Sequence, residues 1–385
     1  MLRRTQGAKR GPIVEFGLFN SGCVLPQFHG DEHRRIMDEV AIVQAAERAG
    51  FKYTWATEHH FLTEYSHLSA NEVFLGYLAA ATSRIHLGSG IFNITPPVNH
   101  PARVAERVAM LDHLSEGRFE FGMGRGSSTT EQKGFGITDP DLTREMFDEV
   151  VREFRKMWRA EEYPGFDGKF FSMPARNVLP KPYSAPHPPM WVAAGNPATF
   201  EKAARMGLGV LCFTMGGPES VKPLVDLYKK EIQNAEPVGE FVNDNIMVTT
   251  QLLCLEDGQR ARDLGAGLGM GYHGSLLFRY LDTFPRPEGV PEWPELLPDP
   301  TPDEIDAAIV AGDTAYGTPE EVEVAIRRYA DAGVDQVVFG LLSSTMEREL
   351  AVETIETFGR HVLPAFDTDP VHRTTRQREA AVSAR

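Results

Sequence analysis

The chain has 385 residues, with 39 Lys and Arg against 54 Asp and Glu, so its formal net charge is −15. Hydrophobic residues make up 42% and charged residues 24% of it, which is the balance of a folded globular protein. The acidic excess argues against nucleic acid and anionic membranes as partners, because both bind basic surfaces. No apolar run is long enough to predict a membrane span.

The three cysteines, Cys23, Cys212 and Cys254, are widely spaced and form no Cys-x-x-Cys pair. They predict neither a zinc site nor a disulfide framework, and they suit the reducing cytoplasm. No His-Glu-x-x-His pattern occurs, so we expect no metal. Residues 1–12 are basic with no apolar run behind them, and we expect a disordered extension rather than a signal peptide.

Short β-rich runs alternate with helical patterns along the whole chain. The first unit is a strand over 13–19 and a helix over 33–49, which Gly50 ends. Seven more strands are predicted, at 51–57, 85–91, 118–123, 190–194, 209–213, 247–255 and 336–341. The helical patterns that follow them lie at 71–82, 101–116, 142–159, 200–206, 219–233, 319–332 and 346–361.

Two segments interrupt this alternation. Residues 163–189 are rich in Pro, Gly and aromatic residues and predict an inserted hairpin and loop, and residues 265–316 predict a long irregular segment. Eight β-then-α units favour parallel strands, and a single (β/α)8 TIM barrel leaves no sheet edge. An open doubly wound sheet is the alternative. We expect one barrel domain with insertions over 13–364 and a disordered tail over 365–385.

In such a barrel the chemistry lies on loops that follow the carboxyl ends of the strands. The second predicted strand runs into Glu58, His59 and His60. An imidazole titrates near neutral pH, so one of these histidines is a candidate general base. Adjacent strand residues face opposite ways, so only one of the two can face the barrel mouth. The alternative is a structural pair that is hydrogen-bonded within the loop.

Two other loops suit an anion. Residues 122–128 carry a Gly-x-Gly-x-Gly pattern around Arg125, so backbone N–H groups, a guanidinium and the hydroxyls of Ser127 and Ser128 can surround phosphate oxygens. Residues 195–199 join a strand to a helix, whose N-terminus can receive an anion with Asn196 and Thr199 as donors. A simple glycine turn and a simple N-cap are the respective alternatives.

The most distinctive stretches are Trp-Ala-Thr-Glu-His-His-Phe-Leu-Thr-Glu at 55–64 and Leu-Asp-His-Leu-Ser-Glu-Gly-Arg-Phe-Glu-Phe-Gly at 111–122. With shorter matches at 100–106, 316–322 and 332–335, they make the sequence resemble the bacterial luciferase-like flavin-dependent monooxygenases over nearly its whole length. That resemblance implies a (β/α)8 barrel that uses O2 and FMN, reduced by a separate reductase. It implies oxygenation of a small hydrophobic substrate through a flavin 4a-peroxide.

The resemblance also implies roles for residues of the second and fourth units. His59 matches a histidine beside the flavin that acts in base chemistry, and Glu58 or a neighbour would orient it. Arg125 matches the arginine that binds the FMN phosphate, and the preceding Gly124 belongs to the same loop. In the luciferase alpha subunit a reactive cysteine stands at the position of Gly124, and its absence argues against light emission.

Further cofactor contacts follow from the same resemblance. Gly195, Asn196 and Thr199 match a second phosphate-binding loop. A non-proline cis peptide beneath the flavin ring is expected at the bond between Ser89 and Gly90 or at its neighbour. The 265–316 segment matches a mobile lid.

The substrate pocket is predicted to be apolar, because five aromatic residues lie near predicted strand ends or in the lid: Phe19, Phe61, Phe92, Phe213 and Phe278. Ordinary core packing is the alternative for each of them. A hydrophobic aldehyde, ketone, terpene or alkane would fit such a lining. By analogy with the family we expect a homodimer. The alternative functions are deazaflavin-dependent hydride transfer and non-catalytic flavin binding.

Overall fold

Eight parallel strands close into a barrel in the computed structural model, which describes residues 13–28, 30–213, 217–284, 286–342 and 344–383. The predicted extension 1–12 lies outside the described residues. Neighbouring strands run from β3 through β2, β1, β13, β10, β9 and β8 to β5, and β5 pairs back to β3. These strands are β1 (Glu15–Asn20), β2 (Tyr53–Ala56), β3 (His86–Ser89), β5 (Phe119–Gly124), β8 (Met190–Ala194), β9 (Gly209–Cys212), β10 (Ile246–Thr250) and β13 (Gln336–Phe339).

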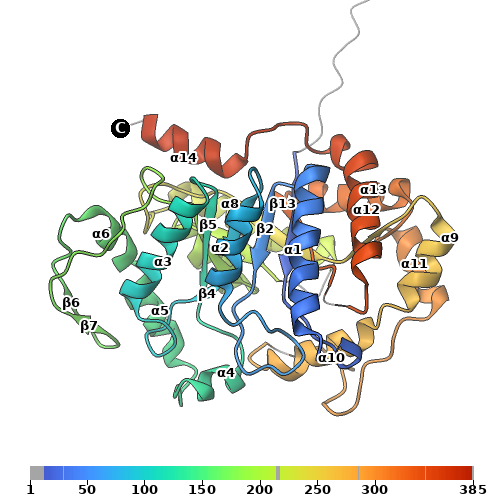
Figure 1. Cartoon of the computed structure of the whole chain (residues 1–385), viewed down its shortest axis with the longest axis horizontal. Coiled ribbons are helices and arrows are strands. Elements are labelled where there is room, and N and C mark those ends of the chain that lie inside the picture. Colours follow the sequence, from blue (N-terminus) through green and yellow to red (C-terminus); the bar gives the residue numbers. More distant parts are fainter. Residues whose placement is uncertain (1–12, 29, 214–216, 285, 343, 384–385) are drawn as a thin grey trace, which may run out of the picture.

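A ring of helices surrounds the barrel (Figure 1). It consists of α1 (Glu32–Ala49), α2 (Asn71–Ala81), α3 (Pro101–Leu114), α5 (Leu142–Val151), α6 (Glu153–Arg159), α7 (Pro197–Arg205), α8 (Pro218–Glu231), α12 (Pro319–Ala332) and α13 (Arg348–His361). The closed barrel predicted from the sequence is thus confirmed, and the doubly wound alternative is wrong. In the described part of the chain no helix combines the length and the apolar character that crossing a membrane requires.

Shorter elements decorate the barrel: β4 (Phe92–Asn93), β6 (Phe166–Asp167), β7 (Ser172–Met173), β11 (Leu252–Cys254), β12 (Ala315–Gly317), the helices α4 (Thr129–Gly134), α9 (Gly258–Ala266), α10 (Met270–Tyr280), α11 (Pro302–Ala311) and α14 (Arg373–Ser383), and the 3-10 turns η1 (Pro26–Phe28), η2 (Ile232–Asn234) and η3 (Leu363–Ala365). Strands β6 and β7 form the antiparallel hairpin that the sequence predicts within 163–189. The predicted strand 247–255 is two strands, because β11 leaves the barrel and pairs with β12.

The prediction of an irregular segment over 265–316 is wrong, since α10 and α11 lie within it. Helix α11 begins with a capping box, in which Thr301 accepts from the Glu304 N–H and the Glu304 carboxylate accepts from the Thr301 N–H. A Thr-x-x-Glu start with Pro302 at the first helical position is a strong helix signal. The many Gly and Pro residues nearby led to the prediction of an irregular segment in place of this helix.

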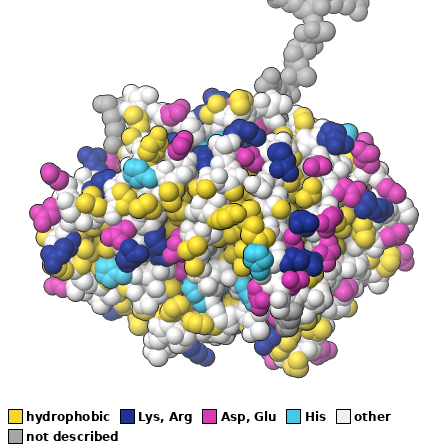
Figure 2. All heavy atoms as spheres, viewed as in Figure 1, with side chains coloured by type: hydrophobic (Ala, Val, Ile, Leu, Met, Phe, Trp, Pro, Cys, Tyr) yellow, Lys and Arg dark blue, Asp and Glu magenta, His cyan; other side chains and the backbone are white. Residues whose placement is uncertain are grey.

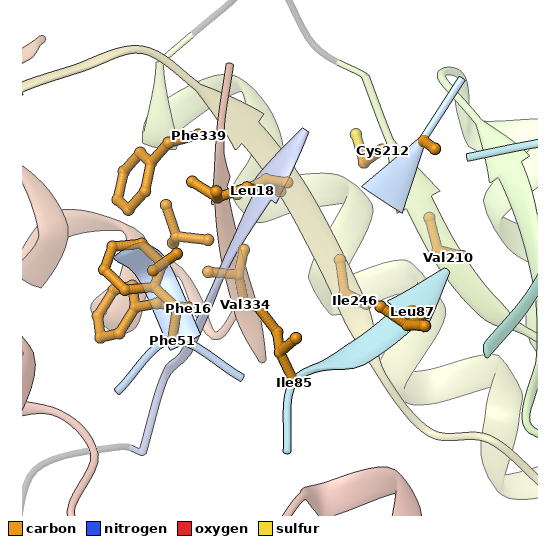
Figure 3. Packing of buried hydrophobic residues seen from close by; sticks show 14 of the residues in the cluster. Phe16, Leu18, Phe51, Ile85, Leu87, Val210, Cys212, Ile246, Val334 and Phe339 are labelled. Atoms are coloured by element: carbon orange, nitrogen blue, oxygen red, sulfur yellow. The ribbon is translucent and has the colours of Figure 1, made fainter. Parts of the chain in front are cut away.

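The main core lies between the barrel and its helices. Figure 3 shows the rings of Phe16, Phe51 and Phe339 gathered in this layer, and those of Phe16 and Phe339 stack with centroids 6.2 Å apart. A smaller cluster fills the inside of the barrel: Tyr53, Trp55, Trp191, Leu211, Met247 and Val338. These large side chains require glycine opposite them, because a Cβ on Gly88 would lie 2.1 Å from Cε3 of Trp55.

Helix α14 lies across the end of the barrel where the strands begin, so the disordered tail predicted over 365–385 is wrong for the described residues (Figure 1). Thr374 is fully buried there and donates to Glu120 Oε1 at 2.5 Å, and the Arg373 N–H donates to Glu15 Oε1 at 3.0 Å. The tail is too polar to predict as a core element. It is ordered because its polar groups hydrogen-bond to carboxylates buried in the barrel floor.

Two histidines stack within this floor. The rings of His86 and His372 have centroids 3.6 Å apart, His86 Nδ1 lies 2.8 Å from Glu120 Oε1, and His372 Nε2 donates to the Lys52 carbonyl at 2.9 Å. Burial raises the pKa of Glu120 to about 8, while burial and the adjacent His86 lower the pKa of His372 to about 2. Burial also lowers the pKa of His86 well below its ordinary value, so both rings are neutral at physiological pH.

We predict that His372 makes the stability of the fold sensitive to acid. The unfolded chain binds a proton at this histidine below about pH 6.5 and the folded chain does not, so its contribution to stability falls as the pH drops below that value. His372→Gln keeps a donor for the Lys52 carbonyl and does not titrate. Relative to this variant, the wild-type free energy of unfolding should decrease by about 2 kcal/mol between about pH 7.5 and 5.0.

Chemical denaturation at the two pH values measures this difference. The control is His113→Gln, because His113 is exposed and also bonds a backbone carbonyl, that of Lys181. A gap between wild type and His372→Gln that does not change with pH would show that His372 is not held neutral.

Candidate active site

The loops predicted to carry chemistry all leave the same end of the barrel. Strands β2, β3, β5, β8 and β9 are consecutive neighbours and run parallel, so the loops after them lie side by side. Helices α4 and α10 lie at this end, opposite α14 (Figure 1). One contiguous arc of the barrel rim therefore holds the predicted base and both predicted anion loops.

His59, just after β2, pairs with a glutamate that local sequence patterns do not reveal. Its Nδ1 lies 3.2 Å from Oε1 and 3.3 Å from Oε2 of Glu131 in α4. Glu131 is itself fixed, because Oε1 also accepts from the backbone N–H of His60 at 2.6 Å. An ionised carboxylate only accepts, so Nδ1 of His59 carries the hydrogen and Nε2 is left as the proton acceptor.

Glu58 does not orient His59, contrary to the expectation from the sequence. Its carboxylate lies 3.1 Å from Nε2 of His60 and accepts from the Asn93 N–H at 3.2 Å and from Asn99 Nδ2 at 2.9 Å. Adjacent residues point in opposite directions, which brings Glu58 to the loop after β3 while His59 turns to α4. Through these contacts Glu58 links the loop after β2 to the loop after β3.

Arg125 follows β5 and has one side-chain partner within the described chain, Thr143 Oγ1 at 2.9 Å. Burial lowers the pKa of its guanidinium, and the positive charge of Arg144 lowers it further against the opposing effect of Asp141. The chain turns at the next residue, Gly126, whose φ of +76° favours glycine. The charge of Arg144 acts on Arg125, and none of the carboxylates in the described residues forms an ion pair with Arg125, which suits a bound anion.

The segment after β3 contains a non-proline cis peptide, between Gly90 and Ile91. The resemblance predicted a cis peptide at the Ser89–Gly90 bond or at its neighbour, and it is the neighbouring bond that is cis. Ser89 itself is fully buried and its hydroxyl bonds to the backbone of Gly122, 2.7 Å from the carbonyl oxygen and 3.0 Å from the nitrogen. Its side chain therefore holds β3 to β5, and a cofactor contact from Ser89 is restricted to its backbone.

The 195–199 loop shows the simple N-cap that was the alternative explanation of its sequence. Asn196 Oδ1 accepts from the Thr199 N–H at 3.1 Å, and Thr199 Oγ1 accepts from the Asn196 N–H at 3.2 Å. The Thr199 hydroxyl also donates to the Asn196 carbonyl at 2.9 Å, so its hydrogen is used within the cap, whereas Asn196 caps α7 through Oδ1 and its Nδ2 hydrogens take no part in the cap. Gly195 remains open toward the Phe284 ring, which a Cβ at this position would approach to 3.5 Å. Because Met123 pairs with Val192, this loop lies beside the Arg125 loop.

Three of the five aromatic residues predicted for the pocket lie at strand ends or in α10, and their role in a substrate pocket stays a prediction. The rings of Phe19 and Phe213 have centroids 6.3 Å apart above the barrel interior, and Phe19 packs against the cluster inside it. Phe278 is buried in a second cluster that joins α10 to the loops after β1 and β2. We call this second cluster the lid cluster, and its buried members are Val24, Leu25, Phe28, Leu62, Tyr65, Leu276, Leu277, Phe278, Tyr280 and Leu281.

The other two predictions of pocket residues are wrong. Phe92 is fully buried in the main core, 6.1 Å from the ring of Phe119 and 6.2 Å from that of Phe121. Because Ile91 packs into the barrel interior, the next side chain faces outward. Phe61 is 60% exposed and packs against Phe135 at the end of α4, with centroids 5.2 Å apart.

Within the described residues, no group of three or more His, Cys, Asp or Glu side chains is arranged to hold a metal ion. The three cysteines are free and buried. Burial raises the pKa of Cys23 and of Cys212 to about 12, so these thiols are protonated at neutral pH.

Residues 14–336 match the family model of luciferase-like monooxygenases. The chain is 31% identical over 220 residues to the alkanal monooxygenase alpha chain of Photorhabdus luminescens, which is 57% of this chain and 59% of that protein. It is 25% identical to the oxygenase component of the flavin-dependent trigonelline monooxygenase of Acinetobacter baylyi, over 91% of this chain and 94% of that protein. An F420-dependent glucose-6-phosphate dehydrogenase of Kineococcus radiotolerans is 28% identical over 76% of this chain and 84% of its own length.

Among solved structures, the monooxygenase RslO1 from Streptomyces bottropensis superposes with a TM-score of 0.74 and 27% identity, over 92% of this chain and 100% of that one. The fold and the arc of polar loops define a (β/α)8 barrel with its candidate site at the carboxyl ends of the strands. The chain belongs to the luciferase-like monooxygenase family. Its alignments to the alkanal monooxygenase alpha chains span about three fifths of their length.

Two residues of the site, Glu131 and Thr143, were not identified from the sequence. Glu131 lies 72 residues from His59, and nothing in either stretch indicates that they pair. Thr143 is buried at the start of α5, where its hydroxyl donates to the Pro140 carbonyl at 2.6 Å. The Ser128 hydroxyl, which was predicted from the sequence as one of the donors of the 122–128 loop, is buried and has no partner among the described residues.

We predict that Glu131→Gln slows turnover by about 10- to 100-fold, because His59 loses the carboxylate that fixes its tautomer. The affinity for flavin should be unchanged, since Glu131 contacts His59 and His60 and not the Arg125 loop. Nitrogen NMR of histidine-labelled protein should show a change of tautomer at His59. Glu131→Asp should restore part of the rate.

The control is Glu58→Gln, which removes the carboxylate facing His60. It should leave the tautomer of His59 as in the wild type. An unchanged His59 spectrum in Glu131→Gln would contradict the positioning role.

Proposed function

We propose that this protein is the oxygenase component of a two-component flavin monooxygenase. It would take FMN reduced by a separate reductase, together with O2 and a small, largely apolar organic substrate, and it would work in the cytoplasm. The balanced reaction consumes substrate, O2 and reduced FMN, and it yields oxygenated substrate, oxidised FMN and water. The observation that carries the proposal is the His59–Glu131 pair beside the Arg125 loop on one arc of the barrel rim.

The residues around Arg125 fit the phosphate of FMN. Arg125 is half-buried and has a single neutral partner, and the buried hydroxyl of Ser128 lacks a partner among the described residues. An anion bound here would neutralise Arg125 and satisfy that hydroxyl. In a chain with a net charge of −15, such local positive potential is needed to hold a phosphate.

Reduced FMN, when bound, would supply the electrons that activate O2 and the oxygen atom that reaches the substrate. Nε2 of His59 would accept and return a proton, since Glu131 holds the hydrogen on Nδ1. Phe19 and Ile91 close the barrel interior below the site, and the lid cluster covers it from α10. Together they would exclude water from the reacting atoms.

The proposal is tested by the fate of labelled oxygen. The purified protein, supplied with reduced FMN and 18O2, is screened against terpenes, ketones, aldehydes and hydroxylated aromatic compounds. We expect a product that gains one 18O atom per O2 consumed, detected by mass spectrometry. Uncoupled consumption of O2 with every substrate, and no labelled product, would contradict a monooxygenase.

A deazaflavin-dependent dehydrogenase is the second candidate, because an F420-dependent relative aligns with most of this chain. The two functions differ in the electron acceptor, so incubation with F420 and alcohols or sugar phosphates separates them. Reduction of F420 without oxygen transfer would favour the second candidate.

We predict that Arg125→Ala weakens binding of FMN by about 1.5–3 kcal/mol, which is the contribution of a hydrogen bond to a charged group. Fluorescence titration of FMN measures the dissociation constant. Arg152→Ala is the matched control, because Arg152 is an exposed arginine beyond the end of α5. A dissociation constant that Arg125→Ala leaves unchanged would overturn the phosphate site.

We also propose that two copies of the chain associate through α2 and α3. Val73 and Tyr77 on α2 and Met110 and Leu114 on α3 are large exposed hydrophobic residues, each pair one helical turn apart. Figure 2 shows hydrophobic side chains gathered on this face of the molecule, over α2 and α3. Contiguous apolar patches of this kind are typical of interfaces.

We predict that the double substitution Tyr77→Glu and Leu114→Glu converts a dimer into a monomer, because it places like charges on both sides of a symmetric interface. Light scattering coupled to size exclusion measures the mass. The control is Val310→Glu, an exposed apolar residue on α11. A wild-type protein that is already monomeric would overturn the prediction.

A further inference from the structure

Two buried side chains of α10, His273 and Tyr280, each carry a polar atom that has no hydrogen-bond partner among the described residues. His273 is 8% exposed and Tyr280 is 5% exposed. Nδ1 of His273 and the hydroxyl of Tyr280 have no partner among the described residues. Leaving a buried polar group unpaired lowers the stability of the fold by about 1–3 kcal/mol. Two such groups in one helix therefore call for a functional explanation.

Both side chains lie one aromatic ring away from His59. The ring of Tyr65 stacks on His273 with centroids 6.0 Å apart and lies 6.4 Å from the ring of Tyr280. The Tyr65 ring also packs edge-on against the His59 ring, with centroids 5.4 Å apart. The unpartnered groups of α10 are thus adjacent to the candidate base, on the side of the site that the lid cluster covers.

Unpartnered groups are concentrated at this end of the barrel. Among the described residues, five of the fourteen such buried atoms belong to Ser128, Gln132, His273 and Tyr280, on α4 with its N-cap and on α10. The two helices are joined at this point, since Asp282, two residues after α10, accepts from the Thr129 N–H at 2.8 Å. Buried polar groups without a partner among the described residues are therefore found on both α4 and α10, at the same end of the barrel.

The chemistry of the pair indicates what would bind. Burial lowers the pKa of His273 to about 4, so its imidazole is neutral at physiological pH and offers one donor and one acceptor. The tyrosine hydroxyl is also a neutral donor and acceptor. The other side chains of the lid cluster are aliphatic or aromatic. The charged group next to the pair is the Arg279 guanidinium, which lies over the face of the Tyr280 ring, 4.7 Å from its centroid, and not at its hydroxyl. Such a site suits a neutral hydroxyl or carbonyl group on an apolar, ring-bearing molecule, and not a carboxylate or a plain hydrocarbon.

We propose that His273 and Tyr280 form a polar subsite beneath α10 that binds a hydroxyl or carbonyl of the substrate and selects against hydrocarbons of the same shape. This inference rests on the proposed monooxygenase function and narrows its substrate class. A site built to hydrogen-bond a polar group discriminates strongly against an analogue that lacks it, because its own groups are then left unpaired.

The first test is stability in the absence of any ligand. Tyr280→Phe removes a hydroxyl without a partner, and it should leave the melting temperature of the free enzyme unchanged or raise it. Tyr272→Phe is the matched control on the same helix, because the Tyr272 hydroxyl donates to the Glu64 carboxylate. This control should lower the melting temperature. A comparable loss in Tyr280→Phe would show that its hydroxyl has a partner within the protein, and the subsite would be overturned.

The second test is discrimination between two probes of one shape, 2-naphthol and naphthalene, by titration of tryptophan fluorescence. Wild type and Tyr272→Phe should bind 2-naphthol about tenfold or more tightly than naphthalene. In Tyr280→Phe and His273→Phe the ratio should fall below about threefold. Equal affinities in the wild type, no binding of 2-naphthol, or a ratio that both variants preserve would each overturn the proposal.

Titration of FMN in the same preparations separates this proposal from the one on which it rests. If FMN binds and 18O enters a product while the probe ratio is flat, the subsite alone is wrong. If the probe ratio behaves as expected but neither FMN binding nor oxygen transfer occurs, the monooxygenase function is wrong and the polar subsite remains.

Discussion

The closure of the barrel between β3 and β5 is the constraint on which the rest of the structure depends. Only two residue pairs form this seam, Leu87 with Phe119 and Gly88 with Glu120, and the strands then separate. Gly88 allows the closure because the Trp55 ring occupies the space of a Cβ. Beyond the seam, Ser89 bridges the gap through its hydroxyl, and the chain passes through the cis peptide into the candidate site.

The barrel was predicted from the sequence, but two of its helices were not. Strand existence and order follow from alternation along the chain, and parallel neighbours put every strand end on one rim. The helix α11 and the tail helix α14 were missed for different reasons. A capping box at Thr301 was available in the sequence but was outweighed by nearby Gly and Pro residues. Helix α14 has no apolar pattern at all, because its contacts with the barrel floor are polar.

The candidate site divides in the same way. Residues predicted from local loop chemistry, such as His59 and Arg125, stand at the rim where the barrel places them. The hydrogen-bond and ring contacts of these residues could not be predicted, because they depend on where the α4 and α10 segments fold back over the rim. Glu58 contacts His60 and not the neighbouring His59. Glu131 and Tyr280 were not identified, because the side chains that they contact lie far away in the sequence.

The position of α14 makes the barrel floor depend on contacts between residues that are far apart in the chain. The carboxyl groups of Glu15 and Glu120 accept hydrogen bonds from Arg373 and Thr374, which lie 358 and 254 residues further along the chain. Such long-range contacts form only after much of the chain is already ordered, because closing so large a loop costs entropy. The buried polar groups of the floor therefore gain these partners only when α14 docks on the assembled barrel.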